Sequence, residues 1–340
     1  MLNRFYRVLP LLLALMLVVL PTVVSAQDEE PLAVFAAYST PAEEPWINVI
    51  QAALTEAEAA GQITLEWVDE LGYAGDMEVT LREAADSGEY DLIVGEAFGN
   101  EEAVRRVARD HPEIPFVFGS GLGPAEPNFS VFDNWIHEPA YLSGLIAGNL
   151  TESGTIGVVA GYPVPEVNRI VNAFITGVEE ANPDAEVLVT FINSWFDPPT
   201  AKEAALAQVD AGADVLFAER FGVIEAAVEN ELPAFGMMSD QNELAPDTVV
   251  TGPVWNMSPT IQYIIEQVNS ESYTAQDLKD FSMMSKGGAM LAPLHGFEET
   301  LDAELIEMIE TRQQEILDGL YRVSIDEASP AAAEFVEASE

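Results

Sequence analysis

The sequence predicts an α/β fold with two parallel sheets. Three observations lead to this prediction. From residue 31 onward, short apolar segments alternate with longer amphipathic segments, which is typical of βαβ units. The short segments are continuously apolar, as strands are when helices cover both faces of a sheet. Eight or more strands are expected, too many for one doubly wound domain of about 150 residues. A single eight-stranded barrel fits the same strand count and length almost as well.

The expected elements follow one another in a regular order. The strands are expected at residues 32–38, 63–69, 91–95, 115–119, 155–160, 186–192, 213–218, 234–237 and 248–252. Helical stretches separate them, for instance at residues 44–60, 139–150, 165–181, 199–211 and 259–269. Several of these helices have a proline at or near the first turn, where a missing N–H leaves no helical hydrogen bond unmade.

The first 26 residues have the pattern of a cleaved secretory signal. Arg4 and Arg7 precede an apolar stretch over residues 8–24, and small residues at 24–26 offer a cleavage site. The alternative is an uncleaved membrane anchor, because the stretch is about long enough to span a bilayer. We expect an exported protein, extracellular or periplasmic, at the outer face of the cytoplasmic membrane.

Composition excludes several classes of function. The chain of 340 residues has 58 acidic and 13 basic side chains, a formal net charge of −45. Nucleic acid is excluded as a partner, since binding it requires a basic surface that neutralises phosphates. There is no cysteine, which excludes disulfides, thiol nucleophiles and the lipid-modified cysteine that tethers many exported proteins.

Catalytic motifs are weak. His111, His137 and His295 stand apart from one another, without the spacing of a zinc site. The chain has no GxSxG elbow, and neither a P-loop nor a GxGxxG fingerprint follows its first strand. Carboxylate pairs are too frequent in so acidic a chain to indicate a site. We therefore expect no enzyme, no catalytic residue, no bound metal and no cofactor.

Aromatic and polar residues coincide at the expected carboxyl ends of nearly every strand. In open α/β sheets, ligands bind outside these ends, so these residues are the candidates for a binding site. The aromatic candidates are Trp46, Phe98, Trp195, Phe221 and Trp255, and the polar candidates are Glu96, Asn193, Glu219 and Asp240.

One long segment carries a family resemblance. Residues 157–197, GVVAGYPVPEVNRIVNAFITGVEEANPDAEVLVTFINSWFD, resemble the second lobe of the basic membrane protein family. These are solute-binding proteins of ABC transporters, related to purine-nucleoside receptors. EPAYLSGLIAG at 138–148, GADVLF at 212–217 and FGMMSDQNELAPDTVVTGPVWN at 235–256 support the resemblance, which covers about residues 31–295. The NSWFDP and EPAYLSGLIAG blocks are its fairly specific parts.

The resemblance implies the type I periplasmic binding protein architecture: two Rossmann-like lobes with parallel sheets, joined by a hinge of three crossover strands. Lobe 1 is then expected over residues 27–136 and about 254–290. Lobe 2 is expected over 137–253 and about 291–323, and an acidic flexible tail over 324–340. The resemblance also implies a monomer that captures a purine base or nucleoside, with an ABC permease and its ATPase as partners.

A purine suits the candidate residues, because a flat π-system with a polar edge requires aromatic faces and a few hydrogen-bonding groups. Trp46 matches the aromatic residue that follows the first strand in the family. Trp195 or Phe221 is the expected partner from the opposite lobe. Asp240 matches an aspartate that receives ribose hydroxyls in the nucleoside binders of the family, and a carboxylate there can equally accept a purine N–H.

Three departures from the family alter these expectations. Residues 251–256, TGPVWN, lack the lysine that nucleoside binders carry near the ribose. Residues 38–46, YSTPAEEPW, lack an Asp-Gly-rich turn. These two differences favour a base or another small heterocycle, and the missing lipobox cysteine argues against lipid anchoring. The alternatives are a sensor of the same fold that feeds a membrane receptor, and an extracellular nucleoside hydrolase.

Overall fold

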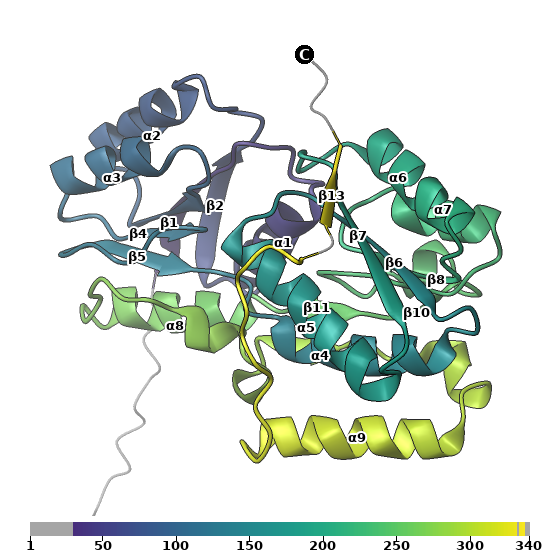
Figure 1. The fold of residues 1–340 in the computed structure, drawn as a ribbon. Coiled ribbons are helices and arrows are strands. Elements are labelled where there is room, and N and C mark those ends of the chain that lie inside the picture. The colour runs from purple at the N-terminus through teal and green to yellow at the C-terminus, as the bar shows by residue number, and fades with distance from the viewer. Residues whose placement is uncertain (1–29, 332, 337–340) are drawn as a thin grey trace, which may run out of the picture. The chain divides into compact units, whose positions relative to one another are not determined.

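The computed structural model describes residues 30–331 and 333–336 (Figure 1). The predicted secretory signal, residues 1–26, lies outside these residues. The first of two large sheets has five parallel strands in the order β2-β1-β3-β4-β5. Its strands are β1 (Leu32–Ala37), β2 (Ile63–Val68), β3 (Leu92–Glu96), β4 (Phe116–Gly119) and β5 (Phe129–Phe132). The helices α1 (Pro45–Ala59), α2 (Asp76–Ser87) and α3 (Glu101–Asp110) connect them. β5 is absent from the predicted strands.

The second sheet has six parallel strands in the order β10-β9-β8-β6-β7-β13. They are β6 (Thr155–Ala160), β7 (Glu186–Phe191), β8 (Val215–Ala218), β9 (Ala234–Phe235), β10 (Val249–Thr251) and β13 (Ala333–Phe335). Its helices are α4 (His137–Leu150), α5 (Pro165–Ala181), α6 (Pro198–Asp210) and α7 (Val223–Glu229). The strands form two separate sheets, so the two-sheet prediction is confirmed and the single barrel is wrong.

Each sheet belongs to one lobe, and three segments connect the lobes. Lobe 1 includes α8 (Ser258–Asn269), which packs on α1, and lobe 2 includes α9 (Ala303–Leu317), which packs on α4. The connecting segments are residues 133–136, β11 (Pro253–Trp255) and β12 (Ala289–Leu291). β11 and β12 pair antiparallel. This is the hinged, three-crossover arrangement that the resemblance implies.

Glycines allow α4 and α5 to lie in direct contact. A methyl group on Gly144 of α4 would collide with the carbonyl oxygen of Phe174, and one on Gly177 of α5 would collide with that of Tyr141. Only glycine permits so close an approach of two backbones. The contact brings the start of α5 beside the hinge, where its first turn reaches the space between the lobes.

The C-terminal segment lies against lobe 2, where the sequence predicts a flexible tail. β13 pairs in parallel with β7, and Phe335 stacks on Phe191 with ring centroids 5.6 Å apart. Asn172 Nδ2 donates to the carbonyl oxygens of Asp326 and Ala328 at 2.9 and 2.8 Å. The residues of this segment do not show the pattern of a strand. The segment forms β13 because the free edge of β7 offers backbone hydrogen-bonding groups. Residues 337–340 of the predicted tail lie outside the described residues.

Candidate functional site

A cavity lies between the lobes at the carboxyl ends of both sheets. Its volume is about 30 Å³, and all the space free of protein atoms, open solvent included, amounts to about 370 Å³. The lobe 1 wall follows β1, β2, β3 and β4, while the lobe 2 wall comes from the start of α5 and from the ends of β7 and β8. The lining residues are Thr40, Glu44, Trp46, Ile47, Tyr73, Glu96, Phe98, Ser120, Glu166, Trp195 and Arg220. This is the edge at which open α/β sheets bind ligands.

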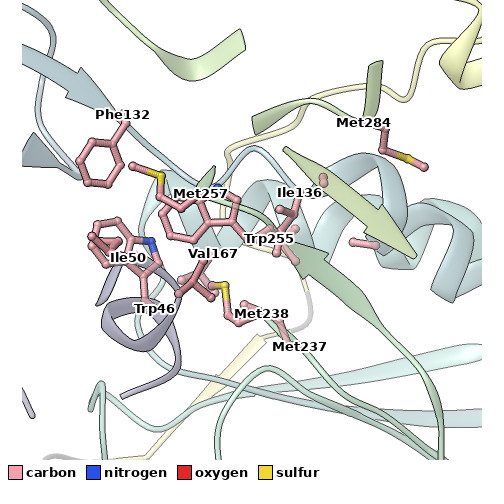
Figure 2. Close-up of a cluster of buried hydrophobic side chains, with 14 of the residues drawn as sticks. Trp46, Ile50, Phe132, Ile136, Val167, Met237, Met238, Trp255, Met257 and Met284 are labelled. Atoms are coloured by element: carbon pink, nitrogen blue, oxygen red, sulfur yellow. The ribbon is translucent and has the colours of Figure 1, made fainter. Parts of the chain in front are cut away.

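Each wall contributes aromatic side chains to the lining. Trp46 of lobe 1 is 6% exposed (Figure 2). Its ring stacks on that of Phe132 with centroids 5.8 Å apart, and it is tilted against that of Trp255 with centroids 5.2 Å apart. Trp195 of lobe 2 is half-buried and meets Phe98 edge to face, with centroids 5.0 Å apart. The cavity lining therefore includes a tryptophan side chain from each lobe.

The start of α1 holds Trp46 in place. Glu44 caps this helix, because its Oε2 accepts from the backbone N–H groups of Trp46 and Ile47 at 2.9 and 3.1 Å. The indole packs against Gly119 at the end of β4, where any side chain would collide with the ring. The indole Nε1 of Trp46 is buried and has no hydrogen-bond partner among the described residues.

Arg220, directly after β8, is bound by carboxylates from both lobes. Its Nη2 lies 2.6 Å from Glu219 Oε1 and its Nε lies 2.7 Å from Glu219 Oε2. Its Nη1 donates to Glu44 Oε1 at 2.9 Å and to the Trp195 carbonyl at 2.8 Å. Burial raises the pKa of Glu44, and the Arg220 charge opposes that rise. This buried ion pair joins the first turn of α1 to lobe 2.

Two further carboxylates face the cavity, and neither forms an ion pair within residues 30–331 and 333–336. Glu96, at the end of β3, accepts from the Ser39 N–H at 3.2 Å. Burial raises its pKa to about 7. Glu166, in the first turn of α5, accepts from the Ser120 hydroxyl at 3.4 Å. Burial, followed by the neighbouring Asp133 carboxylate, raises the pKa of Glu166 well above its usual range.

The nine residues predicted from the sequence separate into three groups. Trp46, Glu96, Phe98 and Trp195 line the cavity. Glu219 lies behind it and holds Arg220. The other four make contacts elsewhere: Asn193 donates to Val336 O at 2.7 Å, Phe221 packs on Phe196, Asp240 binds His295 Nε2 at 2.8 Å, and Trp255 donates to Ser282 Oγ at 3.1 Å behind Trp46.

Seven lining residues are absent from the prediction: Thr40, Glu44, Ile47, Tyr73, Ser120, Glu166 and Arg220. Two of them had a signal. Arg220 directly follows a buried strand in a chain with only 13 basic residues. Glu166 lies in the first turn of the helix after β6, and such turns lie at the same edge as the strand end. The others depend on how loops fold over the strand ends.

Within the described ranges, no group of three or more His, Cys, Asp or Glu side chains is arranged to hold a metal ion. In the same part of the chain, no helix combines the length and apolar character needed to cross a bilayer.

Comparison with known proteins relates this chain to substrate-binding proteins of ABC transporters. The family of PnrA-like substrate-binding proteins of ABC transporters matches residues 34–282. A purine-binding protein of Brucella abortus is 31% identical over 240 residues, 69% of this chain and 68% of that protein. A putative ABC transporter glucose-binding protein of Haloferax volcanii is 34% identical over 190 residues, 55% of this chain. The match spans 48% of that relative, about half of its length.

A solved structure has the same fold. The solute-binding protein of an ABC transporter from Aeropyrum pernix K1 superimposes with a TM-score of 0.74. The alignment covers 87% of this chain and 94% of that one at 19% identity. At this identity the similarity concerns the fold alone.

Proposed function

This chain belongs to the family of PnrA-like ABC transporter substrate-binding proteins, and we propose that it captures a purine base or nucleoside outside the cytoplasm. It then delivers the ligand to an ABC permease driven by its ATPase. The family consists of binding proteins, and we propose that the ligand leaves this protein chemically unchanged.

The observation that carries the proposal is the pair of tryptophan side chains in the cavity lining. Trp46 comes from lobe 1 and Trp195 from lobe 2, and carboxylates lie around them. A purine base offers two π faces and a rim of hydrogen-bonding atoms, and stacking of a base on an aromatic side chain contributes about 1–3 kcal/mol. The Brucella relative is itself named for purine binding.

Closure of the lobes completes the mechanism. The ligand docks on one wall and recruits the other, and the closed form is what the permease recognises. Arg220 and Glu44 make their ion pair only when the walls meet. A ligand drives closure only if it binds the closed form more tightly than the open form, which contact with both walls provides.

A sugar is the second candidate ligand. The Haloferax volcanii relative carries the name of a putative glucose-binding protein. Aromatic faces also stack on sugar rings, and carboxylates accept hydrogen bonds from sugar hydroxyls.

A thermal-shift screen tests the proposal. The purified protein is heated with adenine, guanine, adenosine, riboflavin, glucose and a set of amino acids. A ligand present at about 100 times its Kd adds roughly 2.7 kcal/mol of stability. We expect a purine base or its nucleoside to raise the melting temperature and to be recovered intact. The variant Trp195→Ala, whose side chain is half-buried, should lose the shift. A response to glucose alone would replace the purine with a sugar.

A further inference from the structure

We infer that Glu96 and Glu166, one on each wall of the cavity, recognise hydrogen-bond donors at two edges of the ligand, which therefore carries no negative charge. This inference rests on the proposed function, since it concerns the same cavity. It adds the chemical character of the ligand and the residues that select it.

Among the described residues, Arg220 is the only basic side chain in the lining, and it has little capacity left for an anion. Arg220 makes five hydrogen bonds, to both carboxylate oxygens and the carbonyl of Glu219, to Glu44 and to the Trp195 carbonyl. The single Nε–H is shared between two acceptors of Glu219, so four of the five N–H groups of the guanidinium are used and one on Nη2 is left. Glu219 and Glu44, both buried, balance its charge. A phosphate or carboxylate on the ligand would face Glu96 and Glu166 without a free cation to bind.

Glu96 and Glu166 differ from Arg220, because they have acceptor capacity and neither forms an ion pair within the described ranges. Arg169 and Arg220 act on Glu166 only as nearby charges. Glu96 accepts from the N–H and the hydroxyl of Ser39 and from the Phe98 N–H, and Glu166 accepts from the Ser120 hydroxyl. Lone pairs therefore remain unused on both carboxylates, more of them on Glu166. Burying a carboxylate without enough partners is costly. Burial accordingly raises the pKa of both groups. Donors on a bound ligand would offset this cost.

The placement of the two carboxylates specifies donors at two edges. Glu96 belongs to the strand end of lobe 1 and Glu166 to the helix start of lobe 2, and both line the cavity with Trp46 and Trp195. If a flat ligand packs against the indoles, its edges are free to contact the carboxylates. Adenine fits this pattern, because its exocyclic amino group and its N9–H are donors at opposite ends of the ring system.

Ligand chemistry and mutagenesis together test the inference. Titration calorimetry would measure the Kd of adenine, of purine, which lacks the amino group, of 9-methyladenine, which lacks the N9–H, and of 9-methylpurine, which lacks both. Adenosine and adenosine monophosphate test the exclusion of anions. The proteins are the wild type, Glu96→Gln, Glu166→Gln and the matched control Glu43→Gln, which removes one exposed carboxylate beside the cavity.

We expect removal of either donor to weaken binding to the wild type by up to about ten-fold, as for an ordinary hydrogen bond. Glu96→Gln and Glu166→Gln should each weaken adenine binding by a similar factor. For each variant, removing the donor at one end of the ligand should no longer change the Kd, as expected for coupled partners in a double-mutant cycle. Glu43→Gln should bind as the wild type does, and the monophosphate should bind about 100-fold more weakly than adenosine.

Several outcomes overturn the inference while leaving purine binding intact. The first is an adenine affinity that is unchanged in both glutamine variants. The second is equal affinity of the wild type for adenine and 9-methylpurine. The third is equal affinity of the wild type for adenosine and its monophosphate. If glucose binds and no purine does, the ligand of the proposed function is wrong. In that case, Glu96→Gln and Glu166→Gln test whether the two carboxylates bind the sugar. Unchanged glucose affinity in both variants would overturn the role inferred for them. If no probe binds, both ideas fall.

Discussion

On the lobe 1 wall of the cavity, Trp46 is buried among Phe132 and Trp255 and against a glycine, and its position depends on apolar packing. On the lobe 2 wall, Trp195 is half-buried, and its backbone carbonyl accepts from Arg220, whose guanidinium also lies 5.4 Å from the indole ring. Both tryptophans follow strand ends of parallel sheets. The first is held by close packing and the second by a charged network.

This difference separates two physical roles within one site. Close packing makes the lobe 1 wall rigid, because a filled core resists changes in volume. The lobe 2 wall depends on buried charges that are stable only while every partner is present. Glu44 belongs to both systems, since it caps α1 below Trp46 and pairs with Arg220. Each of the following changes tests one side of this comparison.

The largest effect is expected from Trp46→Ala. Emptying a buried tryptophan site costs about 3–5 kcal/mol of unfolding free energy, and the loss of two aromatic contacts places this variant at the upper end. Trp195→Ala should cost clearly less because its side chain is half-buried. Denaturant unfolding of both variants measures the difference. Equal losses would show that the two walls are packed alike.

Arg220→Met should come next. The substitution leaves Glu219 and Glu44 buried without a cation, and breaking a buried pair in this way costs about 3–5 kcal/mol. Lys202→Met is the control, because Lys202 pairs with Glu229 in a largely exposed salt bridge, and such pairs contribute about 0–1 kcal/mol. The same unfolding measurement applies. A loss no greater than the control would mean that the lobe 2 wall does not depend on its charges.

A smaller effect is expected from pH through Glu96. Its pKa is about 7 in the folded protein, compared with a reference value of 4.5, so the folded state holds a proton that the unfolded state has released. Stability should therefore fall as pH rises from 4.5 to about 7, by up to about 3 kcal/mol from this group. The difference between the wild type and Glu96→Gln across this range isolates the effect. Parallel stability curves would contradict it.

The smallest effects are expected outside the cavity lining. Phe221→Ala and Asp240→Asn should each change ligand affinity by less than about two-fold, since Phe221 packs on Phe196 and Asp240 pairs with His295. Calorimetric Kd values check this. A ten-fold loss in either variant would add that residue to the lobe 2 wall and weaken the contrast between the walls.

Much of the fold and part of the site were predictable because they depend on local pattern. Continuous apolar runs locate the buried strands of both sheets, since a strand covered on both faces is apolar at every position. The strand-end rule then identifies Trp46, Glu96, Phe98 and Trp195. β5 and β13 are short strands that exist because a neighbouring strand offers an edge. No periodicity in their own residues specifies them.

The sequence by itself determined the α/β class with parallel strands and the absence of thiol chemistry, and it predicts the edge at which a ligand would bind. Its pattern left two sheets and a single barrel both open, and the tertiary structure decided between them. Only the tertiary structure decided which charges meet. Glu44 and Arg220 are 176 residues apart in the chain, and their pairing depends on how two lobes face one another. The same holds for Glu96 and Glu166, which lie on opposite walls. Apolar burial is encoded residue by residue, whereas an electrostatic contact between lobes is a property of two surfaces and of the distance between them.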